Sequence, residues 1–237
     1  MQDEVTKHTK KIYDTAKDKK HSFAEKAKEI IVEVCIIVFA VTLSIWLHSW
    51  SEQRHEQQEV REFLRGLKND LKEDVKQIEE NKKVATTLDS NFTFIMNLKK
   101  QPASAGDTTI GHRLYYDLRT TRPQLGRYEG FKSSGKIGTI ENDELKQNIL
   151  TYYQQTAPAL ADGEELVNSL ELKMLDQQMD QLDNQDQHNI RSFVTHGKIK
   201  GLLIVVSYNL KVNIGKYNDA LTQAKKIITQ IDKAEKE

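Results

Sequence analysis

The first strong pattern along the chain is an apolar segment from Ile30 to Trp50, in which Glu33 and His48 are the only acidic or basic side chains. At about 1.5 Å per residue, a helix over this segment rises about 32 Å, close to the thickness of the hydrocarbon core of a bilayer. Trp46 and Trp50 stand at its end, where aromatic side chains meet the membrane surface. The pattern predicts one transmembrane helix over residues 30–50 and makes the lipid bilayer a partner.

Basic residues are unevenly distributed around this helix, which predicts its orientation. After the segment the nearest basic residues are Arg54, Arg61, Arg65 and Lys68. The residues before it are richer in lysine, with Lys7, Lys10, Lys11, Lys17, Lys19, Lys20, Lys26 and Lys28. The positive-inside rule then places residues 1–29 in the cytoplasm as a tail and residues 51–237 outside as a periplasmic domain. Because no A-x-A pattern follows the apolar run, we expect an uncleaved signal anchor in the inner membrane.

Beyond Trp50 no helix breaker occurs until the loop expected at Gln101–Asp107, so a single helix is expected to continue through a polar stalk to Leu98. If it is continuous from Ile30, it is about 100 Å long. Its apolar residues fall near a heptad, with Leu64, Leu71, Ile78, Ala85 and Phe92 each seven apart. Such a stripe is either the inward face of a bundle within one chain or a parallel coiled coil between subunits.

The remaining residues predict further helices. A short helix is expected from Thr108 or Thr109 to Leu118, followed by a turn-rich segment around glycines 126, 130, 135 and 138. Asn142 or Asp143 can cap the next helix, which Pro158 and Gly163 kink or interrupt before it ends near Leu182. Residues 183–197 read as the tip before a last helix over 198–233. The fold class is therefore all-α: one N-terminal transmembrane helix continuing into a long stalk helix, then an antiparallel bundle of about three to four helices.

Composition narrows the class of function. The chain contains 35 basic and 35 acidic residues, which argues against a nucleic-acid partner because such proteins need a dominant basic face. Its single cysteine, Cys35, lies inside the expected membrane helix. The exported domain must therefore hold together by packing rather than by disulfide bonds.

No catalytic, cofactor-binding or metal-binding set can be assembled from the sequence. Residues Gly130–Ile137 come close to the phosphate-binding pattern G-x-x-x-x-G-K-[ST], but Ile137 replaces the hydroxyl that holds magnesium. A structural turn with Phe131 and Ile137 facing inward is the better interpretation. The acidic residues from Asp176 to Asp186 lack the spacing of a calcium loop, and no serine stands in a G-x-S-x-G elbow. We expect neither an enzyme nor a resident cofactor.

Arginine and tyrosine gather in the middle of the chain, and this gathering has two readings. Such residues could form a contact for an anion or a partner protein. Alternatively, the tyrosines are packing residues with wet hydroxyl groups. The candidate contact residues are Arg113, Arg119, Arg127, Tyr128, Tyr152 and Tyr153. A similar choice exists for Glu33, which either snorkels to the membrane surface or makes a contact within the membrane.

Several segments together resemble a family of bacterial single-span membrane proteins known only as a domain of unknown function. They are the apolar helix, the residues 59–74, the run Tyr128–Gly135 and the pair Tyr152-Tyr153. The resemblance covers most of the chain after residue 30 and implies a membrane-anchored helical domain with a turn at 132–135. It supplies no activity. The lysine-rich tail departs from the family pattern and is a candidate for a private cytoplasmic contact.

The expectation for function is a non-enzymatic, membrane-anchored scaffold or accessory subunit of a cell-envelope complex, with other membrane or envelope proteins as partners. The alternative is a periplasmic helical bundle that senses a ligand and is coupled to the membrane through the stalk. We also expect a parallel homo-oligomer, because an isolated stalk would leave its apolar face wet. Its contact residues would be Leu64, Leu71 and Ile78 in the stalk, with the small residues Ala40 and Ser44 in the membrane.

Overall fold

The computed structural model describes residues 2–17, 23–98, 107–182 and 190–236, and among these residues it contains helices and no strands. This confirms the all-α class. The chain divides into two compact units, residues 1–59 and 60–237, which are described one at a time. Residues 101–106 of the expected loop and residues 183–189 of the expected tip at 183–197 lie outside the described residues. The rest of that tip is not a simple turn, because it contains the short helix α7 (Ile190–Thr195).

The first unit contains helix α1 (Gln2–Lys17) and the beginning of helix α2, which runs without interruption from Phe23 to Met96. The apolar side chains of this part of α2 are exposed, including Phe39 at 68% and Trp46 at 60%. Among the described residues, α2 is the one helix long and apolar enough to be a candidate membrane span. Its single long course confirms that the apolar segment continues into the predicted stalk.

Glu33 is buried within this unit, although apolar side chains around it are exposed. Its carboxylate pairs with His8 and Lys11 of α1. The side chain therefore has partners inside its own chain, an environment that the two sequence-based alternatives for Glu33 did not include.

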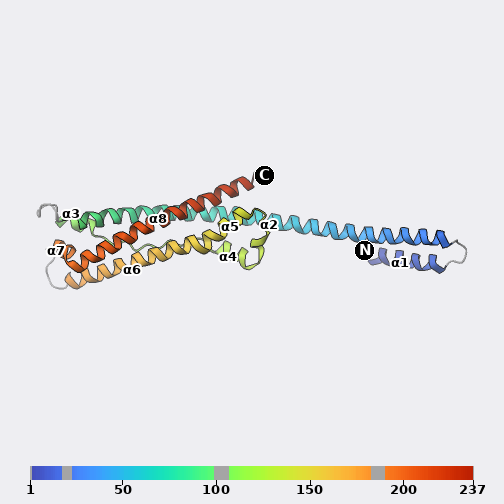
Figure 1. Cartoon of the computed structure of the whole chain (residues 1–237), viewed down its shortest axis with the longest axis horizontal. Helices are drawn as coiled ribbons and strands as arrows, with labels where there is room; N and C mark the ends of the chain where they lie inside the picture. Colours follow the sequence, from blue (N-terminus) through green and yellow to red (C-terminus); the bar gives the residue numbers. More distant parts are fainter. Residues whose placement is uncertain (1, 18–22, 99–106, 183–189, 237) are drawn as a thin grey trace. The chain divides into compact units, whose positions relative to one another are not determined.

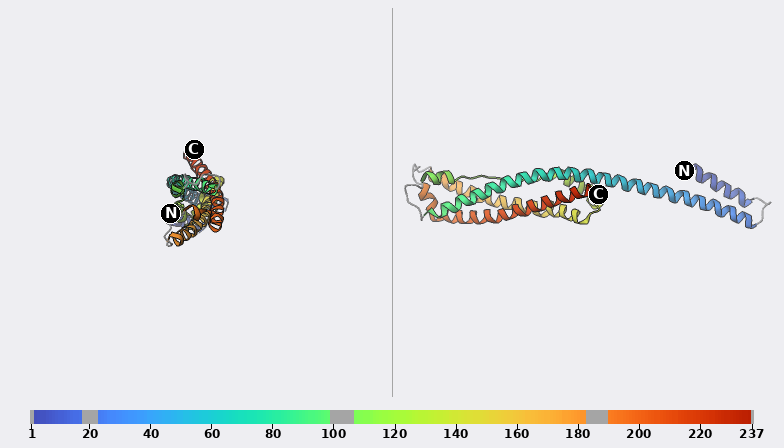
Figure 2. Two further views of the ribbon diagram at one scale, coloured as in Figure 1. Left: turned by 90° about the vertical axis from the view of Figure 1, so that its left-hand side faces the viewer. Right: turned by 90° about the horizontal axis from the view of Figure 1, so that it is seen from above.

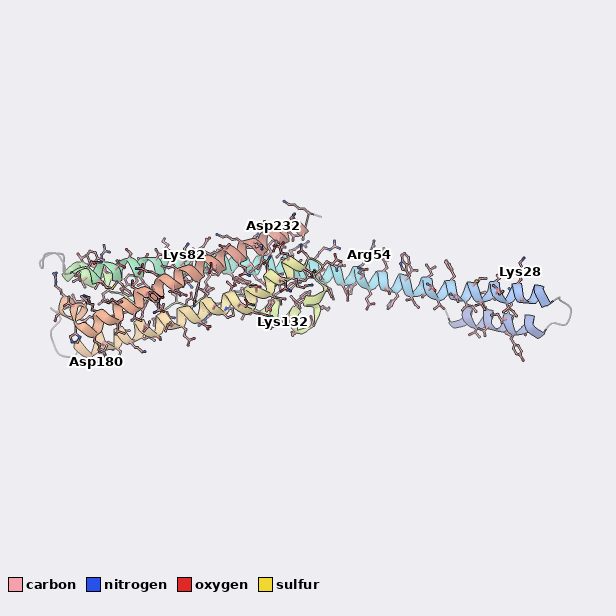
Figure 3. All side chains as sticks on the ribbon, viewed as in Figure 1. Lys28, Arg54, Lys82, Lys132, Asp180 and Asp232 are labelled. Carbon is pink, nitrogen blue, oxygen red and sulfur yellow. The ribbon has the colours of Figure 1, made fainter. Side chains whose placement is uncertain are left out.

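The second unit is built on three long helices that lie side by side (Figures 1 and 2): the part of α2 from Val60 onward, α6 (Ala157–Leu182) and α8 (Gly197–Ala234). Charged side chains such as Lys82, Lys132 and Asp180 extend from these and neighbouring helices in Figure 3. α2 and α6 run in one direction and α8 runs in the other, as Figure 1 shows.

Buried positions on each long helix alternate between spacings of four and three residues, as in a coiled coil. On α8 they run from Ile199 through Leu203, Val206 and Leu210 to Ile231. On α2 the same alternation extends from Val60 to Ile95. This spacing lets each helix keep one stripe facing the others over its whole length within the unit.

The stripe of α2 is covered by its own chain, so the expected contact between subunits at Leu64, Leu71 and Ile78 is wrong. Their exposed fractions are 7%, 0% and 1%. The expectation rested on the idea that no other helix reaches this part of α2, but α8 does, and Lys68 on α2 pairs with Asp232 at 3.1 Å. The inward face of an intramolecular bundle is the alternative that the structure supports.

Short elements close the ends of this bundle. They are α3 (Asp107–Arg113), α4 (Gly126–Ser133), the 3₁₀ turn η3 (Lys136–Thr139), α5 (Asp143–Thr151), the π turn η4 (Tyr152–Thr156) and α7 (Ile190–Thr195). Asn142 caps α5 as predicted, since its side chain accepts a hydrogen bond from the Leu145 N–H at 2.9 Å. The π turn ends at Thr156, two residues before Pro158, where an α-helical register would place the proline ring against the backbone.

Two further predictions about the short elements were wrong. The helix expected to reach Leu118 ends at Arg113, and residues 126–133, expected as turns, form α4. Between them residues 114–125 have no regular structure. The chain leaves the helix here because its N–H groups bond to side chains of other helices, as described next.

Candidate functional site

The three long helices each carry polar side chains at core-facing positions near the middle of the bundle. Asp74 and Asn81 occupy the buried stripe of α2, Glu164 and Glu171 that of α6, and Asn213 that of α8. All five are less than 9% exposed. Buried polar groups cost free energy unless they are hydrogen-bonded, so their partners decide what this layer does.

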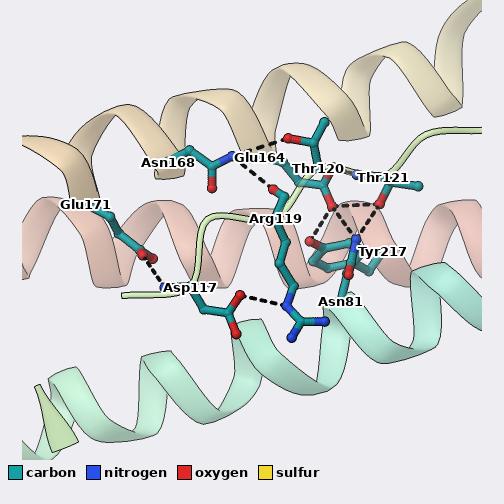
Figure 4. Close-up of polar contacts among 9 residues, drawn as sticks. All are labelled: Asn81, Asp117, Arg119, Thr120, Thr121, Glu164, Asn168, Glu171 and Tyr217. Atoms are coloured by element: carbon teal, nitrogen blue, oxygen red, sulfur yellow. Dashed lines mark hydrogen bonds and ion pairs between the residues drawn. The ribbon is translucent and has the colours of Figure 1, made fainter. Parts of the chain in front are cut away.

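Their main partner is the extended segment 114–125, which we call the strap. Figure 4 shows part of this arrangement, with the strap passing between α2 and α6. Four strap N–H groups donate to side chains of these two helices: Asp117 to Glu171 at 3.0 Å, Thr121 to Glu164 at 2.5 Å, Arg122 to Gln77 at 3.1 Å and Gln124 to Asp74 at 3.0 Å. The side chains replace the backbone partners that a helix or sheet would supply.

The acceptors repeat along their helices with the spacing of the core stripe. Glu164 and Glu171 are seven residues apart on α6, and Asp74 and Gln77 are three apart on α2. On α6, Asn168 adds a bond in the other direction, donating to the Arg119 carbonyl at 2.9 Å. Side chains at this spacing lie on one face of a helix and can therefore hold a chain that runs along it.

Glu164 is the best-satisfied member of the layer. Besides the Thr121 N–H, its carboxylate accepts from the Thr121 hydroxyl at 2.7 Å, the Tyr217 hydroxyl at 2.6 Å and the Asn81 amide at 3.4 Å. Burial raises the pKa of Tyr217, and the adjacent Glu164 raises it further, so the phenol stays a donor. The residues of α2, α6, α8 and the strap thus meet at one carboxylate (Figure 4).

Glu171 differs from Glu164 because one of its oxygens, Oε1, is buried without a hydrogen-bond partner. Burial raises the pKa of the Glu171 carboxyl to about 7, while the hydrogen bond from the Asp117 N–H lowers it and the charge of Asp117 raises it by a smaller amount. The carboxylate of Asp117 is itself paired with Arg119 at 2.7 Å. Glu171 is therefore a carboxyl group that can exchange a proton near neutral pH.

A small recess lies beside this layer, lined among others by Glu171, Asn213, Asp117 and Arg119. It leaves about 20 Å³ for the centres of water molecules. A buried water needs about 10–15 Å³ by this measure, so the recess fits about one water and no metabolite. Asn213 Oδ1 is a second buried acceptor without a partner. Among the described residues no group of three or more His, Cys, Asp or Glu side chains has the arrangement of a metal site.

The three tyrosines that the sequence offered as contact residues are brought together, but in the core. Tyr128 stacks on Tyr153 with ring centroids 4.4 Å apart, and Tyr152 meets Tyr153 edge-on at 4.9 Å. None is more than 4% exposed. The Tyr152 hydroxyl donates to Asp74 at 3.2 Å, and Tyr128 accepts from Gln154 at 2.9 Å. They are packing residues in this structure rather than a surface for a partner.

The three arginines do not form one pocket. Arg127 pairs with Asp70 at 2.9 Å, above Gly66, where a Cβ atom would lie 2.2 Å from the guanidinium carbon. Arg113 lies over the ring of Phe94, with its guanidinium carbon 4.2 Å from the ring centroid. Arg119 belongs to the strap. Each arginine therefore has a separate place on the bundle.

The run that resembles a phosphate-binding loop is the end of α4 and the turn after it. Gly135 adopts φ 77°, a left-handed conformation that glycine adopts without strain. Phe131 stacks on Phe63 with centroids 3.9 Å apart, and Ile137 packs against the same cluster. The predicted role of this segment as a structural turn agrees with its contacts.

The sequence reasoning missed the polar layer, although a signal for it exists. Leu67, Asp74, Asn81, Leu88 and Ile95 continue a heptad series on α2, and two of these five positions are polar. Glu164 and Glu171 interrupt the apolar series of α6 in the same way. Polar side chains at core positions of neighbouring helices predict a buried network, but the strap that they hold is not visible in any local pattern.

Comparisons with known proteins identify a family. The model of a family described as "Family of unknown function (DUF6090)" matches residues 31–194, which is more than half of the 237 residues. The match begins in the apolar part of α2, includes the strap and α6, and ends in α7. Comparisons with curated proteins and with solved structures give no match. The chain belongs to the DUF6090 family, a family of unknown function.

Proposed function

We propose that this protein is a non-enzymatic, membrane-anchored scaffold or accessory subunit of a bacterial cell-envelope complex. Its apolar helix, residues 30–50, crosses the inner membrane once, with the lysine-rich tail in the cytoplasm and residues 51–237 in the periplasm. The basic residues before the apolar helix support this orientation. The exposure of the apolar side chains from Ile31 to Trp50 in the first unit supports a lipid environment.

The proposal rests on what the buried polar side chains bind. Asp74, Glu164 and Glu171 are buried carboxyl groups, as catalytic groups often are. Each instead accepts a hydrogen bond from an N–H of the strap. Because these groups fix the chain to itself, the outer surface of the bundle is what a partner meets.

Affinity purification of the full-length protein from detergent extracts tests the proposal. A scaffold or accessory subunit brings down other membrane or envelope proteins in fixed ratio, under several solubilisation conditions. Recovery of the protein alone under all conditions contradicts the proposal. A reporter fused after Glu237 and a second one fused before Met1 determine the orientation, with periplasmic activity expected for the first fusion only.

We also propose that the protein self-associates within the membrane, with fewer candidate contact residues than the sequence offered. The stalk residues are covered by the chain itself, so the remaining candidates are Ala40 and Ser44, small residues four apart on α2. Small residues let helix backbones approach closely in a bilayer. Ala40→Leu is expected to weaken crosslinking between copies in membranes, and unchanged crosslinking argues against this contact.

A second candidate is sensing by the periplasmic bundle, for which the recess beside Glu171 is the specific observation. Its unpaired acceptors, Glu171 Oε1 and Asn213 Oδ1, suit a proton or one small donor rather than a metabolite. If the bundle senses pH, the complexes recovered at pH 6 and pH 8 differ, and Glu171→Gln removes the difference. Identical complexes at both pH values contradict sensing and leave the scaffold proposal intact.

A further inference from the structure

The first half of α8 is apolar on its outer face as well as on its inner one. Ile204, Val205, Tyr208 and Val212 are 52%, 45%, 67% and 44% exposed. Their spacings of three and four residues bring them to one side of the helix, opposite the buried stripe. Single exposed apolar residues are ordinary, but a continuous group on a helix face is typical of an interaction site.

Two glycines flank this group, and no contact within the chain requires a glycine at either position. Gly201 and Gly215 each stand seven residues from Tyr208 and therefore share its outward direction. A Cβ atom at either glycine would have no neighbouring atom within 4 Å. Glycine inside a helix is less favourable than alanine. The open space above both glycines suits the close approach of a second helix backbone.

The charged side chains along this part of α8 are all basic. No aspartate or glutamate occurs between Asp186 and Asp219. Lys198 and Lys211 lie on the same side as Val205 and Ile204, each seven residues away in the chain. The side chain of Lys211 is 60% exposed, and its Nζ atom lies 3.9 Å from the carboxylate of Asp89 on α2. A partner that covers the apolar group must therefore also face a basic rim.

We propose that this outer face, which we call the α8 face (Gly201, Ile204, Val205, Tyr208, Val212 and Gly215), docks a helix of another envelope protein that has an apolar stripe flanked by acidic residues. The inference rests on the proposed scaffold function and names the chemistry of the partner. The apolar side chains supply buried area, the lysines attract the acidic flanks, and Tyr208 is the central anchor.

The charges argue against a second copy of the chain as the occupant. Two copies related by a two-fold axis place the same basic face against itself, so the lysines of one copy would lie near lysines of the other. Like charges across an interface oppose association. The paired glycines argue for a helix rather than a lipid surface, because a bilayer gains nothing from a missing side chain.

Photo-crosslinking in intact cells tests the proposal with the full-length protein. p-Benzoylphenylalanine replaces Tyr208, and a control replaces Thr222, which is exposed and has the same outward direction fourteen residues later. The expected result is a crosslink at position 208, at least ten times stronger than at 222, to a segment of one other protein. Mass spectrometry of that segment shows apolar residues at three- and four-residue spacing with Asp or Glu beside them.

Charge reversal supplies the second readout. Lys198→Glu combined with Lys211→Glu is expected to reduce the crosslink at position 208 at least tenfold. The matched exchange on the exposed side of α2, Lys72→Glu with Lys83→Glu, leaves it unchanged. Melting temperatures of the purified variants show that both remain folded.

Several results overturn the inference. They are a lipid adduct, a crosslink to a second copy, equal yields or no yield at positions 208 and 222, a partner segment without acidic residues, and insensitivity to charge reversal. The scaffold proposal fails separately, when purification recovers no partner at all. If Tyr208→Glu leaves the purified complex unchanged, the protein is a scaffold that uses another surface.

Discussion

At the residue scale, Glu164 illustrates how a buried carboxylate becomes part of the architecture. It is 2% exposed and accepts hydrogen bonds from a strap N–H and from hydroxyl groups of Thr121 and Tyr217. A buried charge without such partners would be lost as the group took up a proton. With them, the carboxylate joins the strap to α6 and α8 at one point.

Removing this carboxylate is expected to destabilise the bundle. In Glu164→Ala the Thr121 N–H and the Tyr217 hydroxyl lose their acceptor, and buried donors without partners cost about 1–3 kcal/mol each. We expect the free energy of unfolding to fall by about 3 kcal/mol in urea titrations followed by circular dichroism in mild detergent. Glu165→Ala, at an exposed neighbour, serves as control and changes it by less than about 0.5 kcal/mol. Equal effects of the two substitutions would show that the network does not stabilise the fold.

Glu171 makes stability depend on pH. Its folded pKa of about 7 lies above the ordinary value of 4.5, so the folded state holds the proton more tightly than the unfolded state. The stabilisation from this proton is fully present below pH 4.5 and is lost as the pH rises to about 7. The slope reaches at most about 1.4 kcal/mol per pH unit.

The variant Glu171→Gln isolates this contribution, because its amide is neutral at every pH. We expect the wild-type protein to lose stability relative to this variant between pH 4.5 and 7, and the difference to level off above that range. Urea titrations of both proteins at several pH values measure it. A difference in stability between the two proteins that changes below pH 4.5, and not between pH 4.5 and 7, would contradict this prediction. Asp74, whose pKa burial also raises, contributes equally to both proteins and cancels.

At the element scale, the packing of α6 against α8 depends on one glycine. A Cβ atom at Gly163 would lie 2.2 Å from Asn213 Oδ1, and Asn213 is 3% exposed. The glycine therefore makes room for a buried amide. It stands inside α6, where alanine would otherwise be preferred by about 1 kcal/mol.

A double-mutant cycle tests this packing. Gly163→Ala alone is expected to lower the free energy of unfolding by about 1–3 kcal/mol, because overpacking displaces Asn213. Combined with Asn213→Ala, the same change is expected to become neutral or stabilising, since the buried amide is gone and helix propensity improves. The remaining close atom, Lys216 Nζ at 2.8 Å from the Cβ position, is the end of a flexible side chain that can move aside. Thermal unfolding of the four proteins measures the coupling. Additive effects of the two substitutions would mean that these residues do not meet.

The elements also show what local sequence patterns can predict. Apolar spacing placed α8 and the far ends of α2 and α6 close to their observed bounds, and the cap of α5 followed from Asn142 alone. The start of α6 was not predicted, because the helix runs through Pro158 and Gly163 without interruption. The end of α3 was wrong because the N–H groups after Arg113 bond to side chains on α6 and α2, tens of residues away in the chain. Partners at that distance leave no local signal. For the same reason the sequence left open whether the tyrosines form a contact surface or pack inside the protein, and the fold places them in the core.

At the scale of the whole molecule, the second unit buries its own stripes. The alternating spacing on α2, α6 and α8 gives each helix one inward face, and the strap fills the place where polar side chains enter that face. The apolar side chains of the first unit and the α8 face are left exposed. A bilayer and a partner helix are the proposed surroundings for these two surfaces.

The central claim is that the buried polar layer holds the strap as part of the fold. Hydrogen exchange of the wild-type protein in detergent tests it most directly, because it reports on individual N–H groups without substitution. The N–H groups of Asp117, Thr121, Arg122 and Gln124 are predicted to exchange as slowly as those in the middle of α6, although the strap has no helix or sheet. Exchange of these four at the rate of an exposed loop would contradict the account.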